Sequence, residues 1–309
     1  MRTKASSDHP IDSARRPQRV AKAATAAYTV RFRAPTRTCA AVALFAGLAA
    51  VTAWSAQRLW MNPGRFGGGP PKWAARQNFD GSFNYCRGFY ESDRREAGGM
   101  GWWTDYPGAD NNFSVRLAEL TLVRVRLDAS RQPDHVVVRL SDPLLYRCSM
   151  LFMEDVGTVR FSHAEVEQLR AYFLKGGFLW VDDFWGTAAW EQWAEEIGRV
   201  LPPNEFPIFD IPRDHAIMHT LYDVKEIPQV SSINFWHRSG STSERGSDSP
   251  HANFRGIADE RGRLMVVMTH NTDIADTWER EAEDDEYFRR FSPAGYAVGV
   301  NIVLYAMTH

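Results

Sequence analysis

The sequence lacks the features that mark several common classes of protein. Its 309 residues carry a net charge of only -2, so no excess of basic residues indicates a nucleic-acid partner. It has no glycine-rich phosphate loop with the lysine or downstream acid that nucleotide binding requires. No internal repeat is present. What it does have is 44% hydrophobic and 13% aromatic residues, which is enough to build a sizeable core.

Cysteine is also scarce. Of the three cysteines, only Cys86 and Cys148 lie in the part of the chain expected to form a domain. An oxidising compartment would permit them to pair. We do not predict this disulfide, because the expected topology places the two residues at opposite edges of the sheet and a disulfide needs α-carbons within about 7 Å.

Charge is unevenly distributed along the chain. Basic residues dominate residues 1–37, a predicted cytoplasmic leader, and an uncharged apolar stretch follows at residues 38–56. This stretch can just cross a hydrocarbon core of roughly 30 Å as a helix. It is either an uncleaved membrane anchor or a signal peptide cut near residues 53–55. The rest of the chain is therefore expected outside the cytoplasm, anchored to the inner membrane or secreted to the periplasm.

A Gly/Pro-rich stretch, residues 57–78, is typical of a linker, so we expect a single domain over residues 79–309. Alternation and apolar runs predict strands at 81–90, 136–140, 149–155, 178–183 and 262–271. Helical spacing predicts helices at 111–123, 161–177, 188–201 and 295–309. Residues 239–250 are polar and predicted to be an exposed excursion.

The clearest local pattern covers residues 161–183. Ser162 and Glu165 form a predicted capping box, and Gly176 and Gly177 can make the left-handed turn that ends a helix. A short, nearly all-apolar strand follows. Helix, glycine turn and buried strand form the repeating unit of a parallel α/β sheet.

Five motifs together resemble those of a bacterial family, domain of unknown function 4159, over roughly residues 80–309. They are GGMGWWTDYPGADNNF (98–113), LRAYFLKGGFLWVDD (169–183), RDHAIMH (213–219), VVMTHNTDIADTW (266–278) and GVNIVLYAMTH (299–309). The family is similar to class I glutamine amidotransferases and ThuA-like proteins. The resemblance implies a flavodoxin-like parallel sheet between helices, and it implies fold more than function.

One departure from the amidotransferases affects the chemistry. Those enzymes hold a cysteine nucleophile at a sharp turn after a central strand. The matching strand end here is Val181-Asp182-Asp183-Phe184, with no Cys, Ser or Thr before Thr187. Glutaminase chemistry through a thioester is therefore not expected.

Asp182 and Asp183 are predicted to end a central strand, where open α/β sheets form their ligand crevice. In the simplest interpretation, one aspartate caps the following helix and the other pairs with an arginine. Alternatively, the pair binds ligand hydroxyls, acts in catalysis or holds a metal. His215 and His219 have the spacing of metal ligands on a helix, but we favour a histidine fixed beside Asp214 in a loop over the sheet.

The segment WWTDYPGADNN, residues 102–112, combines aromatic rings with carboxylates and amides, as a sugar site does. Many of the tryptophans could instead belong to the core, and Asp110 has the character of a helix N-cap. His270 and Asn271 finish another strand and are expected near the same crevice. Asp273 and Asp276 are expected to cap or orient there.

These observations lead to one main hypothesis and two alternatives. The main hypothesis is an exported or membrane-tethered α/β domain that binds a carbohydrate-like ligand or an envelope protein. The first alternative is a carboxylate- or metal-dependent hydrolase acting on an envelope carbohydrate, and the second is a scaffold whose tryptophan-rich surface docks an envelope protein. No cofactor or resident metal is predicted. The candidate ligand-binding residues are Trp103, Asp105, Asp183, His215 and Asn271, and the candidate catalytic residues are Asp182, Asp183 and His215.

Overall fold

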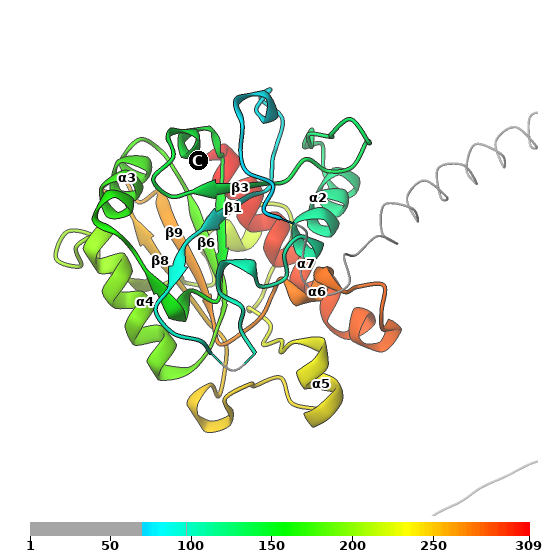
Figure 1. Ribbon diagram of the computed structural model, residues 1–309. Helices are drawn as coiled ribbons and strands as arrows, with labels where there is room; N and C mark the ends of the chain where they lie inside the picture. The colour runs from blue at the N-terminus through cyan, green and yellow to red at the C-terminus, as the bar shows by residue number, and fades with distance from the viewer. Residues whose placement is uncertain (1–69, 97) are drawn as a thin grey trace, which may run out of the picture. The chain divides into compact units, whose positions relative to one another are not determined.

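The computed structural model describes residues 70–96 and 98–309 (Figure 1). The predicted leader (1–37) and the predicted apolar segment (38–56) lie outside the described residues. Within the described ranges, no helix combines the length and the apolar character needed to span a membrane. Part of the predicted linker contacts the domain, because Trp73 forms a β-bridge with Val137 and the Ala74 N–H donates to the Val137 carbonyl at 2.9 Å.

The domain is built on a mixed sheet of seven strands. Across the sheet the order is β3 (Val136–Arg139), β1 (Cys86–Phe89), β4 (Leu151–Glu154), β6 (Leu179–Phe184), β9 (Leu264–His270), β8 (Asn253–Ala258) and β7 (Phe209–Asp210). The first five are parallel, whereas β8 and β7 extend the sheet as antiparallel strands. The five parallel strands confirm the sequence prediction. Strands β7 and β8 were missed, because β8 is only partly buried and contains no apolar run.

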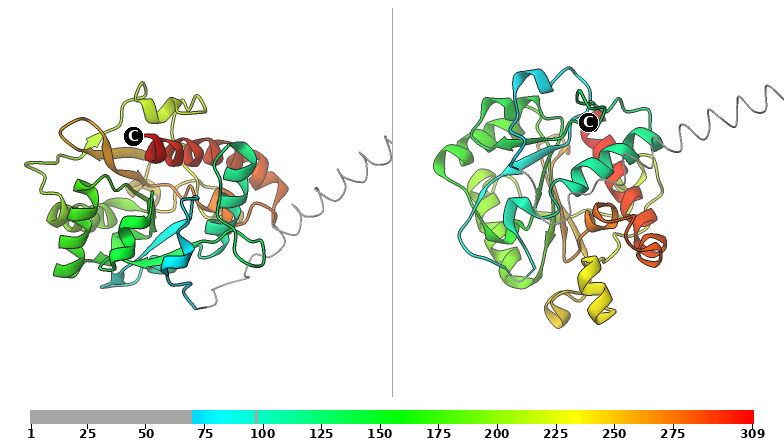
Figure 2. Two further views of the ribbon diagram at one scale, coloured as in Figure 1. Left: turned by 90° about the horizontal axis from the view of Figure 1, so that it is seen from above. Right: turned by 45° about the vertical axis from the view of Figure 1, so that its right-hand side comes forward.

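Helices cover both faces of the sheet (Figures 1 and 2). One face packs against α3 (His163–Leu174) and α4 (Gly186–Val200), and the other against α2 (Gly108–Leu120), α6 (Asp276–Glu279) and α7 (Asp285–Thr308). The alternation of a strand decides which face each residue serves. In β6, Leu179 and Val181 join the first core and Trp180 joins the second.

The helix signals in the sequence have mixed outcomes. The capping box is confirmed, since the Ser162 side chain accepts from the Glu165 N–H and the Glu165 carboxylate accepts from the Ser162 N–H at 2.8 Å. Gly176 has the predicted left-handed conformation, with φ 101°. The prediction for Asp110 was wrong. Helix α2 begins at Gly108, so Asp110 lies inside its first turn and is buried against Arg87.

The prediction for the cysteines was also wrong. Cys86 and Cys148 form a disulfide with their α-carbons 6.0 Å apart. Cys86 begins β1, and β4, which starts three residues after Cys148, is the direct neighbour of β1, with Cys86 opposite Leu151. The strand order brings the two residues together, and a single sequence does not specify that order.

Candidate functional site at the carboxyl ends of the strands

Asp182 and Asp183 are adjacent in sequence but have different roles. Between Val181 and Phe184 the pairing of β6 with β9 shifts register, so that two residues of β6 face one residue of β9. Asp183, inside this bulge, has a left-handed backbone with φ 50°. Bulges of this kind re-aim a side chain and are common beside active sites.

Asp182 points into the core and holds the structure together. Its Oδ1 accepts from the Thr269 hydroxyl at 2.6 Å, and its Oδ2 accepts from the Ala275 N–H at 2.9 Å. The side chain is fully buried, and this burial raises its pKa to about 7. Asp182 therefore fixes the chain that leads from β9 into α6.

Asp183 lines a small cavity at the carboxyl ends of the strands. Its Oδ1 accepts from the Trp185 indole N–H at 2.7 Å, so its partner is a tryptophan and not the arginine considered from sequence. Neither aspartate caps α4. The Thr187 N–H at the start of that helix donates instead to Asp248 at 3.0 Å.

The cavity has a volume of about 50 Å³ and acidic walls. Loops after β1, β4, β6 and β9 meet here with the segment that follows α5 (Ile233–Ser239). The cavity is large enough for an ion with one or two waters. Six carboxylates line it together with one arginine, Arg245: they are Glu96, Asp105, Asp155, Asp183, Glu244 and Asp273.

Three carboxylates come close enough together to share one cation. Asp105, Asp273 and Asp276 each offer an oxygen, and these oxygens lie within 4.8 Å of one another. The Asp276 Oδ2 is oriented by the Tyr287 hydroxyl at 2.9 Å and the Ile233 N–H at 2.5 Å. The Asp105 Oδ2 is buried and has no hydrogen-bond partner among the described residues.

The crowding of like charges perturbs these acids. Burial, followed by the negative charges of Glu154 and Asp276, raises the pKa of Asp105 well above its ordinary value. Burial and then Asp183 raise the pKa of Asp273 in the same way. Buried carboxyls with like-charged neighbours hold their protons until a cation offsets the repulsion. The cavity is therefore suited to a positively charged ligand.

Backbone strain is concentrated at the same place. Four residues other than glycine have left-handed backbones here: Asp105 at φ 59°, Asp155 at 51°, Asp183 at 50° and Asn271 at 62°. Such conformations cost on the order of 1–3 kcal/mol each and occur mostly at functional sites. The only other residue of this kind in the described part of the chain is Arg131, in a turn. The strain aims several side chains at one cavity.

A buried arginine supports the loop that carries Asp105. Arg87 on β1 is fully buried, its Nε lies 3.1 Å from Asp110, and one of its Nη groups donates to Glu154. The same Nη donates to the Thr104 carbonyl at 2.8 Å. Arg87 therefore fixes the backbone next to Asp105, although its own side chain is in the core.

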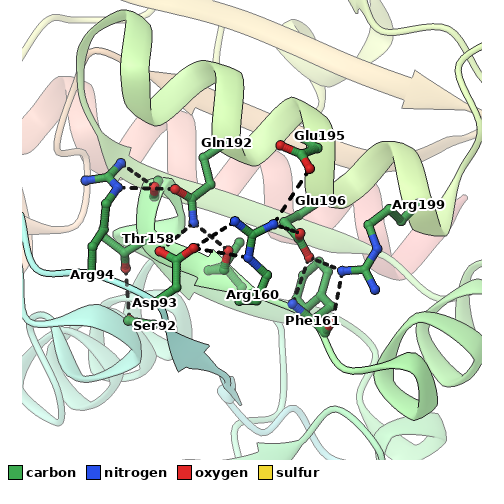
Figure 3. Close-up of polar contacts among 12 residues, drawn as sticks. Ser92, Asp93, Arg94, Thr158, Arg160, Phe161, Gln192, Glu195, Glu196 and Arg199 are labelled. Carbon is green, nitrogen blue, oxygen red and sulfur yellow. Dashed lines mark hydrogen bonds and ion pairs between the residues drawn. The ribbon is translucent and has the colours of Figure 1, made fainter.

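A polar network fixes the chain that follows β1 (Figure 3). The short strands β2 (Glu91–Ser92) and β5 (Val159–Arg160) pair next to α4. Arg160 donates to Asp93 at 2.8 Å and to the buried Glu196 at 2.7 Å, and Gln192 donates to Asp93 at 3.0 Å (Figure 3). Arg94 donates to the Gly157 carbonyl at 2.6 Å. The chain that leaves β1 is thus tied to α4.

The structure brings together only part of the predicted site. Asp105 and Asp183 line the acidic cavity, and Trp103 lines a wider cavity beside it. Asn271 lies two residues before Asp273 of the cavity wall, but its side chain is already used. Its Oδ1 accepts from the Gly186 N–H at 2.8 Å, and its Nδ2 donates to the His251 carbonyl at 3.3 Å. Asn271 connects two turns.

His215 lies apart from the cavity. Its ring packs against Tyr305 at 5.7 Å, and the Tyr305 hydroxyl accepts from the N–H of Leu264, the first residue of β9. Asn271 follows the other end of β9, and a seven-residue strand is roughly 20 Å long. The His215 Nδ1 accepts from the Ile217 N–H at 3.2 Å, and His219 contacts Asp223, so the two histidines form no joint site.

Sequence reasoning missed several acids of the cavity. Asp155 follows β4 directly and was included only as the end of a predicted strand. Glu244 lies in the segment predicted to be an exposed excursion, but its carboxylate accepts from the Ser232 N–H at 2.9 Å and reaches the cavity. Three of the tryptophans belong to the core, since Trp180, Trp193 and Trp278 are fully buried.

Fold and site together define a class: a mixed α/β domain with an acidic cavity at the carboxyl ends of its parallel strands. The chain belongs to the family described as domain of unknown function DUF4159, whose model matches residues 94–307. This match confirms the family resemblance of the five motifs. No curated protein matches the chain.

Proposed function

We propose that this domain binds a divalent cation in the acidic cavity and uses it to hold a ligand. The observation that carries the proposal is the convergence of the Asp105, Asp273 and Asp276 oxygens within 4.8 Å. All three donors are hard carboxylate oxygens, which favour Mg²⁺, Ca²⁺ or Mn²⁺ over metals that prefer sulfur or nitrogen. Asp105 and Asp273 line the acidic cavity together with Asp183, which would bond a water on the ion.

The sheet topology supports a ligand at this position. Across the sheet, the parallel strands run in the chain order second, first, third, fourth, fifth, which is the order of flavodoxin-like sheets. Ligands of such sheets bind at the carboxyl ends, where the strand order reverses. Here the reversal falls between β1 and β4, and Asp105 and Asp155 lie in the loops that follow these two strands.

The likeness that we propose to the amidotransferase-like superfamily concerns the fold alone. The strained residue near the carboxyl end of the central strand β6 is Asp183, close to the place where the amidotransferases have a cysteine. Asp183 accepts a hydrogen bond from the Trp185 indole N–H and cannot form the thioester that a cysteine forms. Binding therefore fits this site better than glutaminase chemistry.

The proposed location is the cell envelope, with the domain anchored by residues 38–56 or secreted after their removal. The buried Cys86–Cys148 disulfide supports this location, because structural disulfides persist in oxidising compartments. In that compartment the partner or ligand would be an envelope molecule, with carbohydrate as the proposed class.

One observation favours a hydrolase as the second candidate. Burial raises the pKa of Asp155 to about 7, and Asp155 lines both the acidic cavity and the wider one. A carboxyl that titrates near neutrality can give and take a proton at working pH. Asp155 beside a bound cation would provide the acid–base group of a metal-dependent hydrolase.

Calorimetric titration of the full-length protein with Mg²⁺, Ca²⁺ and Mn²⁺ tests the cation site. We expect at least one cation to bind, and to raise the unfolding free energy by about 2.7 kcal/mol at a hundred times its Kd. Asp105→Asn should abolish this gain without destabilising the cation-free protein, because the raised pKa keeps the Asp105 carboxyl protonated there and the amide is also neutral and of similar size. Asp285→Asn is the matched control, since its side chain is 96% exposed.

Two outcomes would contradict the proposal. The first is an absence of heat and of stabilisation with all three cations. The second is cation binding that Asp105→Asn and Asp285→Asn affect equally, which would place the cation elsewhere on the protein.

A further inference from the structure

A wider cavity adjoins the acidic cavity. Its volume is about 570 Å³, and it shares Glu96, Gly99 and Asp155 with the acidic cavity. Residues 92–95, Met100, Gly101 and Trp103 form the rest of its wall. Pockets for small organic ligands span roughly 300–1,000 Å³, so this one can hold a molecule the size of a sugar derivative.

The carboxylates of the wider cavity already accept hydrogen bonds from the protein. Asp93 accepts from Arg160 and Gln192, and Glu96 accepts from Arg94 at 2.8 Å. Asp155 accepts from the Gly101 N–H at 2.7 Å. A ligand that only donates hydrogen bonds would compete with these internal donors.

The unused groups of the wider cavity are donors. The Trp103 indole N–H is buried and has no acceptor in the described part of the chain. Arg95 is exposed, and its guanidinium makes no ion pair or hydrogen bond with any residue of 70–96 or 98–309. A buried donor without a partner is costly, and an arginine fork matches carboxylate and phosphate oxygens. The buried indole N–H therefore lacks an acceptor among the residues described, and the exposed guanidinium is free to bind one.

We infer that the wider cavity binds an organic oxyanion, whose carboxylate or phosphate group lies between the cation and the donors Trp103 and Arg95. The inference rests on the proposed cation site. Six acidic side chains line the adjoining cavity and give an anion little attraction, whereas a bound cation supplies positive charge and offers open coordination positions. Cation and oxyanion therefore bind in that order, and each increases the affinity for the other.

Calorimetry on the full-length protein tests this order with defined probes. Glucuronate supplies a carboxylate, glucose 6-phosphate supplies a phosphate, and glucose is the neutral control. We expect one of the two oxyanions to bind when Mg²⁺, Ca²⁺ or Mn²⁺ saturates the protein, and neither to bind in EDTA. Glucose should not bind in either condition. Comparing the two probes identifies which oxyanion the cavity prefers.

Variants separate the two cavities. Arg95→Gln and Trp103→Phe each remove one donor and should weaken oxyanion binding by about tenfold, as expected for one charge-assisted or buried hydrogen bond. Neither should change the cation affinity. Arg261→Gln, in the exposed turn between β8 and β9 at the opposite end of β9, is the matched control and should behave as wild type.

Several results would overturn the inference. If a cation binds but neither oxyanion binds in its presence, the inference fails and the cation site stands. Oxyanion binding that is equal in EDTA, or that neither Arg95→Gln nor Trp103→Phe weakens, would also refute it. If no cation binds at all, the proposed function fails, and this inference fails with it.

Discussion

Replacing Asp155 with asparagine should make the stability of the domain less dependent on pH. Asp155 is 3% exposed, and its burial raises its pKa from 3.8 to about 7. Asparagine keeps an oxygen that can accept the Gly101 N–H, so the variant removes the titration and retains the hydrogen bond. The comparison with wild type therefore isolates one carboxyl group.

The sign and size follow from linkage. Below about pH 4 both the folded and the unfolded wild type hold the Asp155 proton, and the carboxyl contributes no pH dependence. As the pH rises toward 7, the unfolded chain releases the proton while the folded protein retains it, so wild type loses stability. A difference of about three pKa units at roughly 1.4 kcal/mol each gives about 4 kcal/mol above pH 7.

Urea denaturation of both proteins, in EDTA and at pH values from about 4 to 8, measures this difference. The unfolding free energy of Asp155→Asn minus that of wild type should rise by about 4 kcal/mol across this range and then level off. The exposed control Asp285→Asn should give a flat difference. A flat difference for Asp155→Asn as well would refute the buried, proton-holding carboxyl on which the hydrolase alternative depends.

Three further predictions concern the framework. The Cys86–Cys148 disulfide closes a separation of 62 residues, so the double alanine variant should lose about 4 kcal/mol of unfolding free energy. Reducing agent should lower the stability of wild type only. A loss below about 1 kcal/mol would show that the disulfide does not constrain the unfolded chain. Arg87→Met should lower the unfolding free energy by about 3–5 kcal/mol in denaturant titration, because it leaves the buried carboxylates of Asp110 and Glu154 without their counter-charge. Unchanged stability would contradict the buried ion pairs. His215→Gln should leave the cation Kd unchanged in calorimetry, because His215 lies near the start of β9; a weaker Kd would contradict its separation from the site.

Much of the fold is predictable because its signals are local. The Ser162 capping box, the Gly176 turn and the apolar run through Val181 involve residues a few positions apart, and hydrogen bonds along the chain fix them. The antiparallel strands β7 and β8 are not predictable in this way, because β8 is stabilised by pairing with β9 and β7 by pairing with β8, and not by their own composition.

The candidate site was only partly predictable. An aspartate pair at the end of an apolar strand indicated the right edge of the sheet, and Asp105 and Asp183 do line the cavity. His215 was grouped with them because sequence gives no measure of distance between loops. Glu244 was missed because a polar, small-residue segment looks exposed until the rest of the chain packs against it.

The sequence by itself determined the local elements, the family and the carboxyl edge where the acids gather, because these depend on spacing along the chain. Only the tertiary structure decided that Asp182 supports the core while Asp183 faces a cavity, since that depends on a bulge against β9. It also decided that Asp105, Asp273 and Asp276 converge, although about 170 residues of chain separate the first from the others. Parallel strands place their carboxyl ends at one edge whatever their separation in sequence, and that geometry creates the site.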